Sequence, residues 1–178
     1  MIGSSKIAQI QTLVRNGLYY LTEHADDEAA ADGFDIYDVE QGILAGKIRR
    51  TWPKEGKYEV IGSALDGRRI RDYLPYYSDR QSTCDYGVRR QTQAMKGKTM
   101  SFWEGETCEY CGGPIVEKRV TLHRKVRGGY FLIENVPTGV CAECGTRYYA
   151  ANVLKTIAES LRGRRQAVRE VVVPVYSL

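Results

Sequence analysis

Cys108-Glu-Tyr-Cys111 and, thirty residues later, Cys141-Ala-Glu-Cys144-Gly145 place two Cys-x-x-Cys pairs in one chain. Each pair can form a tight loop that points two sulfur atoms at one position, and a neighbouring glycine allows the sharp turn. Four thiolates fill the coordination sphere of a structural Zn²⁺ ion and leave no position for a catalytic water. Two disulfides or two redox pairs are the alternatives. One structural zinc ion is favoured, because nothing indicates secretion and a redox motif does not need a second copy.

Cysteines and charges are unevenly distributed along the 178 residues, which carry a net charge of +4. Four of the five cysteines lie after residue 107, which favours two small domains. Residues 1–46 contain two basic and eight acidic residues, whereas residues 47–71 contain eight basic and three acidic residues. The basic middle can bind a phosphate backbone, or its charges can pair with the acidic helices before it.

Long apolar segments are missing from the sequence. It contains no run of about 18 apolar residues and no apolar signal-peptide core near its N-terminus. We therefore expect a cytoplasmic protein that does not meet a membrane and keeps its thiols reduced.

The N-terminal part is predicted to consist of three helices followed by an antiparallel meander, an α+β arrangement. Ser4 or Ser5 is suited to cap the first helix and Asp35 the third, and Asp66-Gly67 is suited to a tight hairpin turn. The hydrophobic spacing gives helices over residues 5–16, 24–31 and 35–46, an extended or turning segment over 18–22, and strands over 48–52, 58–65 and 68–74.

Three motifs accompany these elements. They are His24 at the second helix, Gly46-Lys47-Ile48, and the hairpin from Tyr58-Glu-Val60-Ile-Gly62 through Asp66-Gly67-Arg68. Over about residues 5–72 the chain resembles the RelE-like and BrnT-like toxin domains of bacterial toxin–antitoxin pairs. The resemblance implies cleavage of mRNA, free or on the ribosome, by residues that activate the ribose 2′-OH. The candidates for this role are His24, Arg49, Arg50, Tyr58 and Arg68.

Each of these candidates also has a purely structural interpretation. His24 can cap or pack beneath its helix, the arginines can pair with the acidic helices, and Tyr58 can be a packing residue of its strand. Both interpretations stay open at the level of sequence.

Residues 76–96 interrupt the pattern, because they contain a single valine and no isoleucine or leucine where a toxin of this type needs further strands. One hypothesis is a junction of two joined reading frames, with Met100 as the start of the second protein. The alternative is a basic, flexible linker. We assign residues 76–100 to a linker or interrupted segment.

Alternating apolar residues between the two cysteine pairs predict a strand from Val116 to Val126, a turn, and a returning strand from Tyr130 to Val136. His123 falls in the polar register of the first strand. We therefore expect it to face solvent rather than to act as a fifth ligand. A helix is predicted from Asn152 to Leu161.

Three stretches and the short helix that follows them carry a second resemblance. They are Cys108 to Gly113, Val116 to Thr121 and Ile133 to Tyr148. Over most of residues 105–162 the chain is similar to the YgiT-type, or MqsA-like, zinc-finger antitoxins. The resemblance implies a zinc domain that binds a partner toxin, in cis or in trans. Longer members add a helix-turn-helix that represses the operon. The thirteen residues after Arg165 are too few for that motif.

Within those thirteen residues, Glu170 to Tyr176 is rich in valine and is predicted to be a strand. It can close the sheet of its own domain. Alternatively, it can add to the edge of a partner's sheet or of a second copy, which gives a homodimer.

The sequence therefore predicts an α+β protein of two small domains: a RelE-like toxin-type domain over residues 1–75 and a YgiT-type domain with a zinc-bound hairpin and helix over residues 101–178. The predicted function is a type II toxin–antitoxin module whose zinc domain binds and neutralises an RNase-type toxin domain. The alternatives are a ribonuclease (mRNA interferase) restrained by its fused zinc domain, and a zinc-ribbon regulator that binds nucleic acid. The last alternative uses Arg119, Arg124, Lys125, Arg127, Arg162, Arg164 and Arg165.

Overall fold

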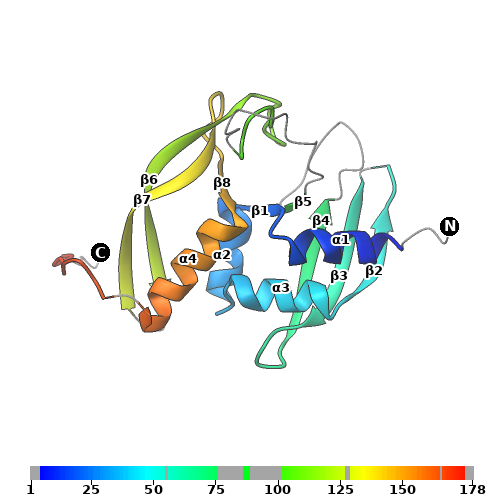
Figure 1. Ribbon diagram of the computed structural model, residues 1–178, viewed down its shortest axis with the longest axis horizontal. Coiled ribbons are helices and arrows are strands. Elements are labelled where there is room, and N and C mark those ends of the chain that lie inside the picture. Colours follow the sequence, from blue (N-terminus) through cyan, green and yellow to red (C-terminus); the bar gives the residue numbers. More distant parts are fainter. Residues whose placement is uncertain are drawn as a thin grey trace, which may run out of the picture.

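The computed structural model describes residues 5–54, 56–75, 86–88, 102–126, 129–164 and 166–174. In these ranges the chain is a mixed α+β protein with two antiparallel sheets and four α-helices (Figure 1). The predicted α+β class is confirmed. None of the helices described is long and apolar enough to span a membrane.

The three predicted N-terminal helices are present as α1 (Lys6–Arg15), α2 (Glu23–Ala31) and α3 (Ile36–Leu44). Both predicted caps are made. The Ser5 hydroxyl accepts a hydrogen bond from the Ala8 amide at 3.4 Å, and the Asp35 carboxylate accepts one from the Tyr37 amide at 2.9 Å. These caps fix the ends of α1 and α3.

The predicted meander forms the smaller sheet, in which β2 (Lys47–Trp52), β3 (Lys57–Ser63) and β4 (Arg69–Pro75) follow one another in order. The predicted Asp66-Gly67 turn joins β3 to β4, with Gly67 at φ 84°. Helix α3 packs closely on this sheet, because a Cβ atom at Gly62 would lie 1.9 Å from the Gly42 carbonyl oxygen. Only glycine at this position allows the close contact.

The larger sheet combines strands from both halves of the chain in the order β5-β1-β8-β7-β6. Its long hairpin, β6 (Ile115–Val126) with β7 (Gly129–Cys141), agrees with the two strands predicted between the cysteine pairs. The other members are β1 (Tyr19–Thr22), β5 (Tyr86–Val88) and β8 (Arg147–Ala150). Strand β8 leads directly into α4 (Ala151–Glu159), the predicted C-terminal helix, which ends in a turn over Ser160–Arg164.

Pairing of β1 with β8 is the feature that joins the two halves. Tyr20 lies opposite Ala150, Leu21 opposite Tyr149, and Thr22 opposite Tyr148. The segment predicted only as extended or turning is thus a strand, and one hydrophobic core contains residues of both halves. The predicted division into domains over residues 1–75 and 101–178 stays a prediction, and it does not coincide with the division between the two sheets, because the larger sheet takes strands from both parts.

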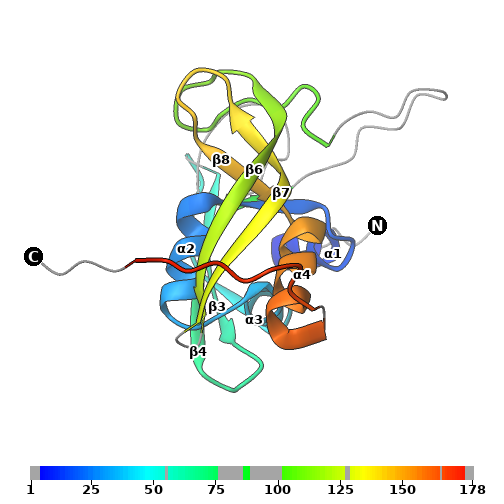
Figure 2. The ribbon, with the colours of Figure 1, turned by 90° about the vertical axis from the view of Figure 1, so that its left-hand side faces the viewer.

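Two other expectations meet a different outcome. Tyr86–Val88 form β5 and pair with β1, so the segment over residues 76–100 contains a sheet strand at these three positions; the rest of it lies outside the described residues. Residues 170–174 of the predicted Glu170–Tyr176 strand belong to neither sheet, so the expectation that this segment closes the sheet of its own domain is wrong for these residues, and its addition to the sheet of a partner stays a prediction. These residues cross the β6–β7 hairpin instead of following a strand edge, and Pro174 has no amide to donate to a ladder (Figure 2).

Candidate metal centre

Two loops of the same construction carry the four cysteines. The Gly112 amide donates to the Cys108 carbonyl at 2.8 Å, and in the second loop the Gly145 amide donates to the Cys141 carbonyl at 3.1 Å. Both glycines have positive φ angles, 74° and 79°, which side-chain-bearing residues rarely adopt. The glycines next to the Cys-x-x-Cys pairs therefore make the sharp turns that the sequence predicted.

A second hydrogen bond closes each loop at its base. The Cys108 amide donates to the Gly113 carbonyl at 2.7 Å, and the Cys141 amide donates to the Thr146 carbonyl at 2.9 Å. The loops also touch each other at Gly113, where a Cβ atom would lie 2.4 Å from the Glu143 side chain. The backbone thus holds both cysteine pairs in place against one another.

All four cysteine sulfur atoms lie within 4.8 Å of one another. The Cys108 and Cys144 sulfurs are 3.5 Å apart, and the Cys111 and Cys141 sulfurs are 3.4 Å apart. Thiolates bound to zinc at about 2.3 Å in a tetrahedron are separated by about 3.8 Å, whereas a disulfide needs about 2.05 Å. The four cysteines could hold a metal ion, and their type and spacing are compatible with zinc.

The surroundings of the sulfurs change their acidity in different directions. Hydrogen bonds from the side chain and amide of Thr146 lower the pKa of Cys144 to about 6. The Gly113 amide lowers the pKa of Cys111, but the neighbouring sulfurs, Cys141 first, outweigh it and raise this pKa to about 12. The Cys111 thiol therefore retains its proton in the absence of a cation, and a bound dication would displace it.

Tyr148 connects the cluster to the large sheet. Its hydroxyl donates to the Cys108 sulfur at 3.1 Å and accepts a hydrogen bond from the Glu109 amide at 3.3 Å. Burial opposes ionisation of Cys108, but this hydrogen bond and those from the Cys111 and Tyr110 amides lower its pKa. Because Tyr148 is fully buried in β8, the first cysteine loop is fixed to the strand that pairs with β1.

An aromatic cluster surrounds this connection. The Tyr20 ring on β1 meets the Tyr148 ring edge-on, with centroids 5.4 Å apart, and lies 5.6 Å from the Trp103 ring. Trp103 packs against Gly139 of β7, where any Cβ atom would lie within 2.6 Å of the indole. The cysteine loops, the hairpin and the N-terminal strand thus share one small core.

Ion pairs along α2 also join the N-terminal half of the chain to the C-terminal half. Arg124 of β6 is buried, and its guanidinium contacts both Asp26 and Asp27. Arg147 donates to the Glu23 carboxylate at 3.0 Å, and the Tyr149 hydroxyl donates to the same oxygen at 3.2 Å. Three residues of the C-terminal half therefore bind the acidic side of α2.

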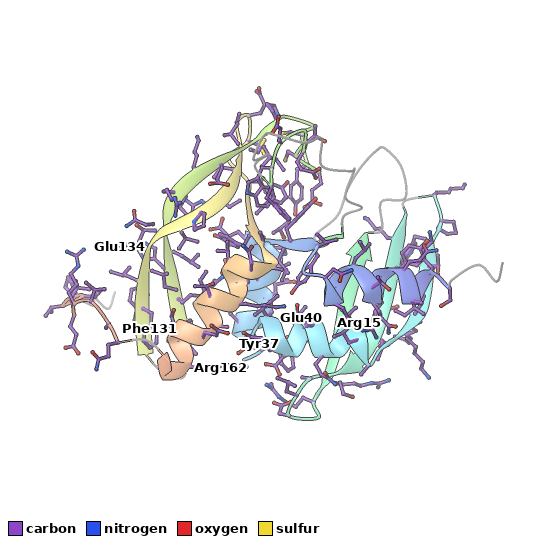
Figure 3. The ribbon with its side chains drawn as sticks, viewed as in Figure 1. Arg15, Tyr37, Glu40, Phe131, Glu134 and Arg162 are labelled. Atoms are coloured by element: carbon purple, nitrogen blue, oxygen red, sulfur yellow. The ribbon has the colours of Figure 1, made fainter. Side chains whose placement is uncertain are left out.

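A third set of contacts joins α3 to α4 (Figure 3). The Tyr37 hydroxyl lies 2.9 Å from the Glu159 carboxylate, and Lys155 lies 2.7 Å from the Glu40 carboxylate. Arg162 donates to the Asp35 carboxylate at 2.9 Å and stacks on the Tyr37 ring at 4.8 Å. We call the three sets together the seam: the β1–β8 pairing with its aromatic cluster, the α2 ion pairs and the α3–α4 contacts.

The five catalytic candidates are not brought into one site. Tyr58 lies near the start of β3 and packs against the core, whereas Arg68 precedes the residue that pairs with Ser63 at the other end of this strand. Five residues of strand separate these ends by roughly 17 Å. His24 lies on α2, outside the small sheet, and pairs with Glu28 at 3.4 Å.

The arginine candidates make structural contacts. Arg68 donates to Asp66 and to the Asp32 carbonyl and stacks on Phe34. Arg49 lies 3.4 Å from the buried Glu59 carboxylate, and Arg50 lies over the Trp52 ring at 5.6 Å. The expected contact with the acidic helices is therefore found for Arg68 alone, at the Asp32 carbonyl, whereas Arg49 and Arg50 contact residues of the small sheet.

Among the residues proposed for nucleic-acid binding, Arg124 and Arg162 bind carboxylates of the N-terminal half. Arg119 donates to the Asn135 carbonyl at 3.0 Å on the hairpin surface, and Lys125 is exposed there. His123 is exposed and lies 2.7 Å from the Tyr130 hydroxyl, which confirms its solvent-facing position. Arg127, Arg165 and the side chain of Arg164 lie outside the described residues.

Sequence reasoning did not identify the seam. Arg124 carried a weak signal, because it interrupts the apolar register of the predicted strand, but Lys118 interrupts the same register and is exposed. The acidic residues of α2 are the partners of Arg124.

Comparisons of this chain with protein-family models, with curated proteins and with solved structures find no match.

Replacing Cys144 with serine is expected to abolish stoichiometric zinc binding, because three thiolates and a hydroxyl form a much weaker site. Native mass spectrometry of the full chain should give one zinc ion per wild-type chain and none for Cys144→Ser. Cys84→Ser is the matched control, since Cys84 is the cysteine that belongs to neither Cys-x-x-Cys pair of the sequence. Retention of one zinc ion by Cys144→Ser contradicts the four-thiolate site.

Replacing Tyr148 with phenylalanine is expected to weaken zinc binding by about 10- to 100-fold, the usual effect of losing a hydrogen bond to a metal ligand. Competition with a chromogenic chelator measures the change. Tyr149→Phe is the control, because that equally buried tyrosine donates to Glu23 instead of a sulfur. Equal zinc affinities of the two variants would contradict a role for Tyr148 in holding the ligands.

Proposed function

We propose that this chain is a single-chain toxin–antitoxin module, in which a zinc-bound C-terminal half binds the N-terminal toxin-type half in cis and keeps it inactive. The seam is the observation that supports this function. The C-terminal half does not sit beside the N-terminal half as an independent zinc finger; it contributes the strand that pairs with β1 and the arginines that bind α2.

The chemistry of the two surfaces supports a binding role. The first 46 residues are strongly acidic, and Arg124, Arg147 and Arg162 of the other half bind three separate acidic positions among them. Arg124 is only 6% exposed and Asp26 is 15% exposed, so this pair is shielded from water, whereas Asp27 is 57% exposed. A contact of this kind is selective, because a surface without these carboxylates leaves a buried charge unpaired.

Zinc has a structural role in this proposal. Bound to Cys108, Cys111, Cys141 and Cys144, it would fix the base of the β6–β7 hairpin and the start of β8. No chemistry at the metal is required. This chain's residues then present Arg124 and the β8 edge to the N-terminal half.

Opening the seam is expected to release the activity of the N-terminal half. Removing one partner of a buried ion pair costs about 3–5 kcal/mol, so Arg124→Glu should raise the open population roughly 10²- to 10⁴-fold. Growth of bacteria that express the full chain, and degradation of their RNA, are the measurements. Wild type should be tolerated, whereas Arg124→Glu should arrest growth and degrade RNA.

Arg119→Glu is the matched control, because Arg119 lies on the same strand but is exposed and donates to the Asn135 carbonyl of the hairpin. Zinc content and hydrogen exchange of α2 show whether the variant has opened without losing its metal-bound half. An Arg124→Glu chain that binds one zinc ion and exchanges α2 rapidly, but neither arrests growth nor degrades RNA, would refute the neutralising function.

A second candidate function, direct RNA binding by the N-terminal half, is favoured by a basic hollow on the small sheet. Its volume is about 310 Å³, and the buried Glu59 carboxylate holds Arg49 at 3.4 Å and Arg71 at 3.3 Å beside it. The hollow has four cationic side chains and is suited to phosphate groups. It is lined by Lys47, Arg49, Ile61, Arg69 and Arg71.

Titration with single-stranded RNA at several salt concentrations tests this candidate. Combined Lys47→Ala and Arg71→Ala substitutions should weaken binding and reduce the salt slope by about 0.7 for each phosphate that is no longer neutralised. Arg15→Ala removes an exposed basic residue of α1 and should change neither quantity. Equal affinities of the double variant and wild type would exclude the hollow as the RNA site.

A further inference from the structure

The small sheet has an apolar face and a basic face. Val60 and Ile70 are buried in the core that also contains apolar residues of α1 and α3. Successive side chains of a strand point to opposite faces, so Glu59 and Ile61 point away from these helices. The basic hollow lies on this second face.

Strand register gathers the cations of the hollow around one apolar residue. Lys47 of β2 and Arg71 of β4 lie directly opposite Ile61, on its two sides. Arg69 precedes Arg71 by two residues on β4 and therefore lies on the same face. These three cationic residues are exposed. Their positions follow from the pairing of the strands, and they surround the hollow on opposite sides of Ile61.

A buried carboxylate orders the fourth cation and one of these three. The Glu59 side chain is only 3% exposed, and its Oε1 atom lies 3.4 Å from Nη1 of Arg49 and 3.3 Å from Nε of Arg71. The register of β2 shifts next to Arg49, which brings this residue to Glu59. A guanidinium has five N–H donors, so both arginines retain donors for a ligand while Glu59 fixes their positions.

The charges of the hollow are not balanced within it. Its four cations outnumber the Glu59 carboxylate by three. Like charges gathered at one place repel each other, and exceptions of this kind are expected at functional sites. The matching ligand is compact and carries about three negative charges, which a single phosphodiester does not supply.

We propose that the hollow binds a diphosphate group, supplied by a free nucleotide or by the 5′ end of an RNA. A terminal phosphate carries about two negative charges at neutral pH, and the adjoining phosphate adds another. Arginine forks are suited to such oxygens. The volume of about 310 Å³ is at the lower end of the range for small-ligand sites. This inference rests on the hollow of the second candidate function, but not on binding of an RNA chain.

Isothermal titration of the zinc-loaded full chain, at constant ionic strength, tests the site with inorganic pyrophosphate and inorganic phosphate as probes. Wild type should bind pyrophosphate at least about tenfold more tightly than phosphate, because pyrophosphate meets more of the four cations. Combined Lys47→Ala and Arg69→Ala substitutions leave the Glu59 contacts in place and should weaken pyrophosphate binding about 10- to 100-fold.

Arg15→Ala is the control, since this exposed residue belongs to α1, and it should leave the affinity unchanged. Equal, weak affinities for the two probes overturn the proposal. An unchanged pyrophosphate affinity of the double variant also overturns it.

Glu59→Gln separates the positioning of the arginines from their charge. The substitution keeps the size of the side chain and raises the net charge of the hollow, so charge alone predicts tighter pyrophosphate binding. Loss of the ordered arginines instead predicts binding weakened about tenfold. The thermal unfolding midpoint shows whether the variant is folded. Tighter binding by a folded Glu59→Gln chain contradicts the proposed arrangement.

Two RNA oligonucleotides of one sequence, with a 5′-hydroxyl or a 5′-triphosphate end, and a nucleoside diphosphate distinguish the source of the group. Tighter binding of the triphosphate RNA than of the nucleotide supports an RNA end, and the reverse order supports a free nucleotide. Pyrophosphate binding without any RNA binding supports this inference and refutes the second candidate function. RNA that binds equally with either end, and that pyrophosphate does not displace, overturns this inference and leaves the second candidate function in place.

Discussion

The hydrogen bond from the Tyr148 hydroxyl to the Cys108 sulfur is the contact on which the rest of the structure depends. Tyr148 belongs at once to the cysteine cluster, to the aromatic core and to the strand that pairs with β1. A displaced cysteine loop therefore displaces β8, and a displaced β8 removes one neighbour of the N-terminal strand. The Tyr148 side chain therefore links the positions of the four sulfur atoms to the position of the N-terminal strand β1.

The hairpin explains why such a connection is needed. Strands β6 and β7 are long, but much of their surface is exposed, and a two-stranded hairpin is marginal by itself. The cysteine loops fix one end of the hairpin, and the buried Arg124 fixes its middle to α2. Binding of a structural zinc ion contributes about 10–16 kcal/mol, comparable to the whole stability of a typical domain. The position of Arg124, and thus the seam, is expected to depend on the metal.

The cysteine cluster and most helices and strands could be predicted from the sequence, because their signals are local. Spacing within Cys108–Cys111 and Cys141–Cys144 determines the loops, and Asp35 and Asp66-Gly67 mark a helix start and a turn. Strand β1 gave no such signal, because all four of its residues are buried and show no alternation.

The remaining differences have similar physical reasons. Valine-rich residues 170–174 have the composition of a strand, but a segment forms a strand only when it pairs with the edge of a sheet. These residues cross β6 and β7 instead (Figure 2). The proposed catalytic residues were chosen by type and resemblance, whereas convergence on one site depends on the tertiary fold. Arg68 and Tyr58 lie at opposite ends of β3 for that reason.

Hydrogen exchange of the full chain, with and without a zinc chelator, tests the central claim that the metal centre holds the two halves together. The account predicts that removing the metal accelerates exchange in the Tyr19–Thr22 strand as well as in the cysteine loops and the β6–β7 hairpin. If the loops exchange rapidly while Tyr19–Thr22 keeps its protection, the cysteine cluster does not control the junction between the halves.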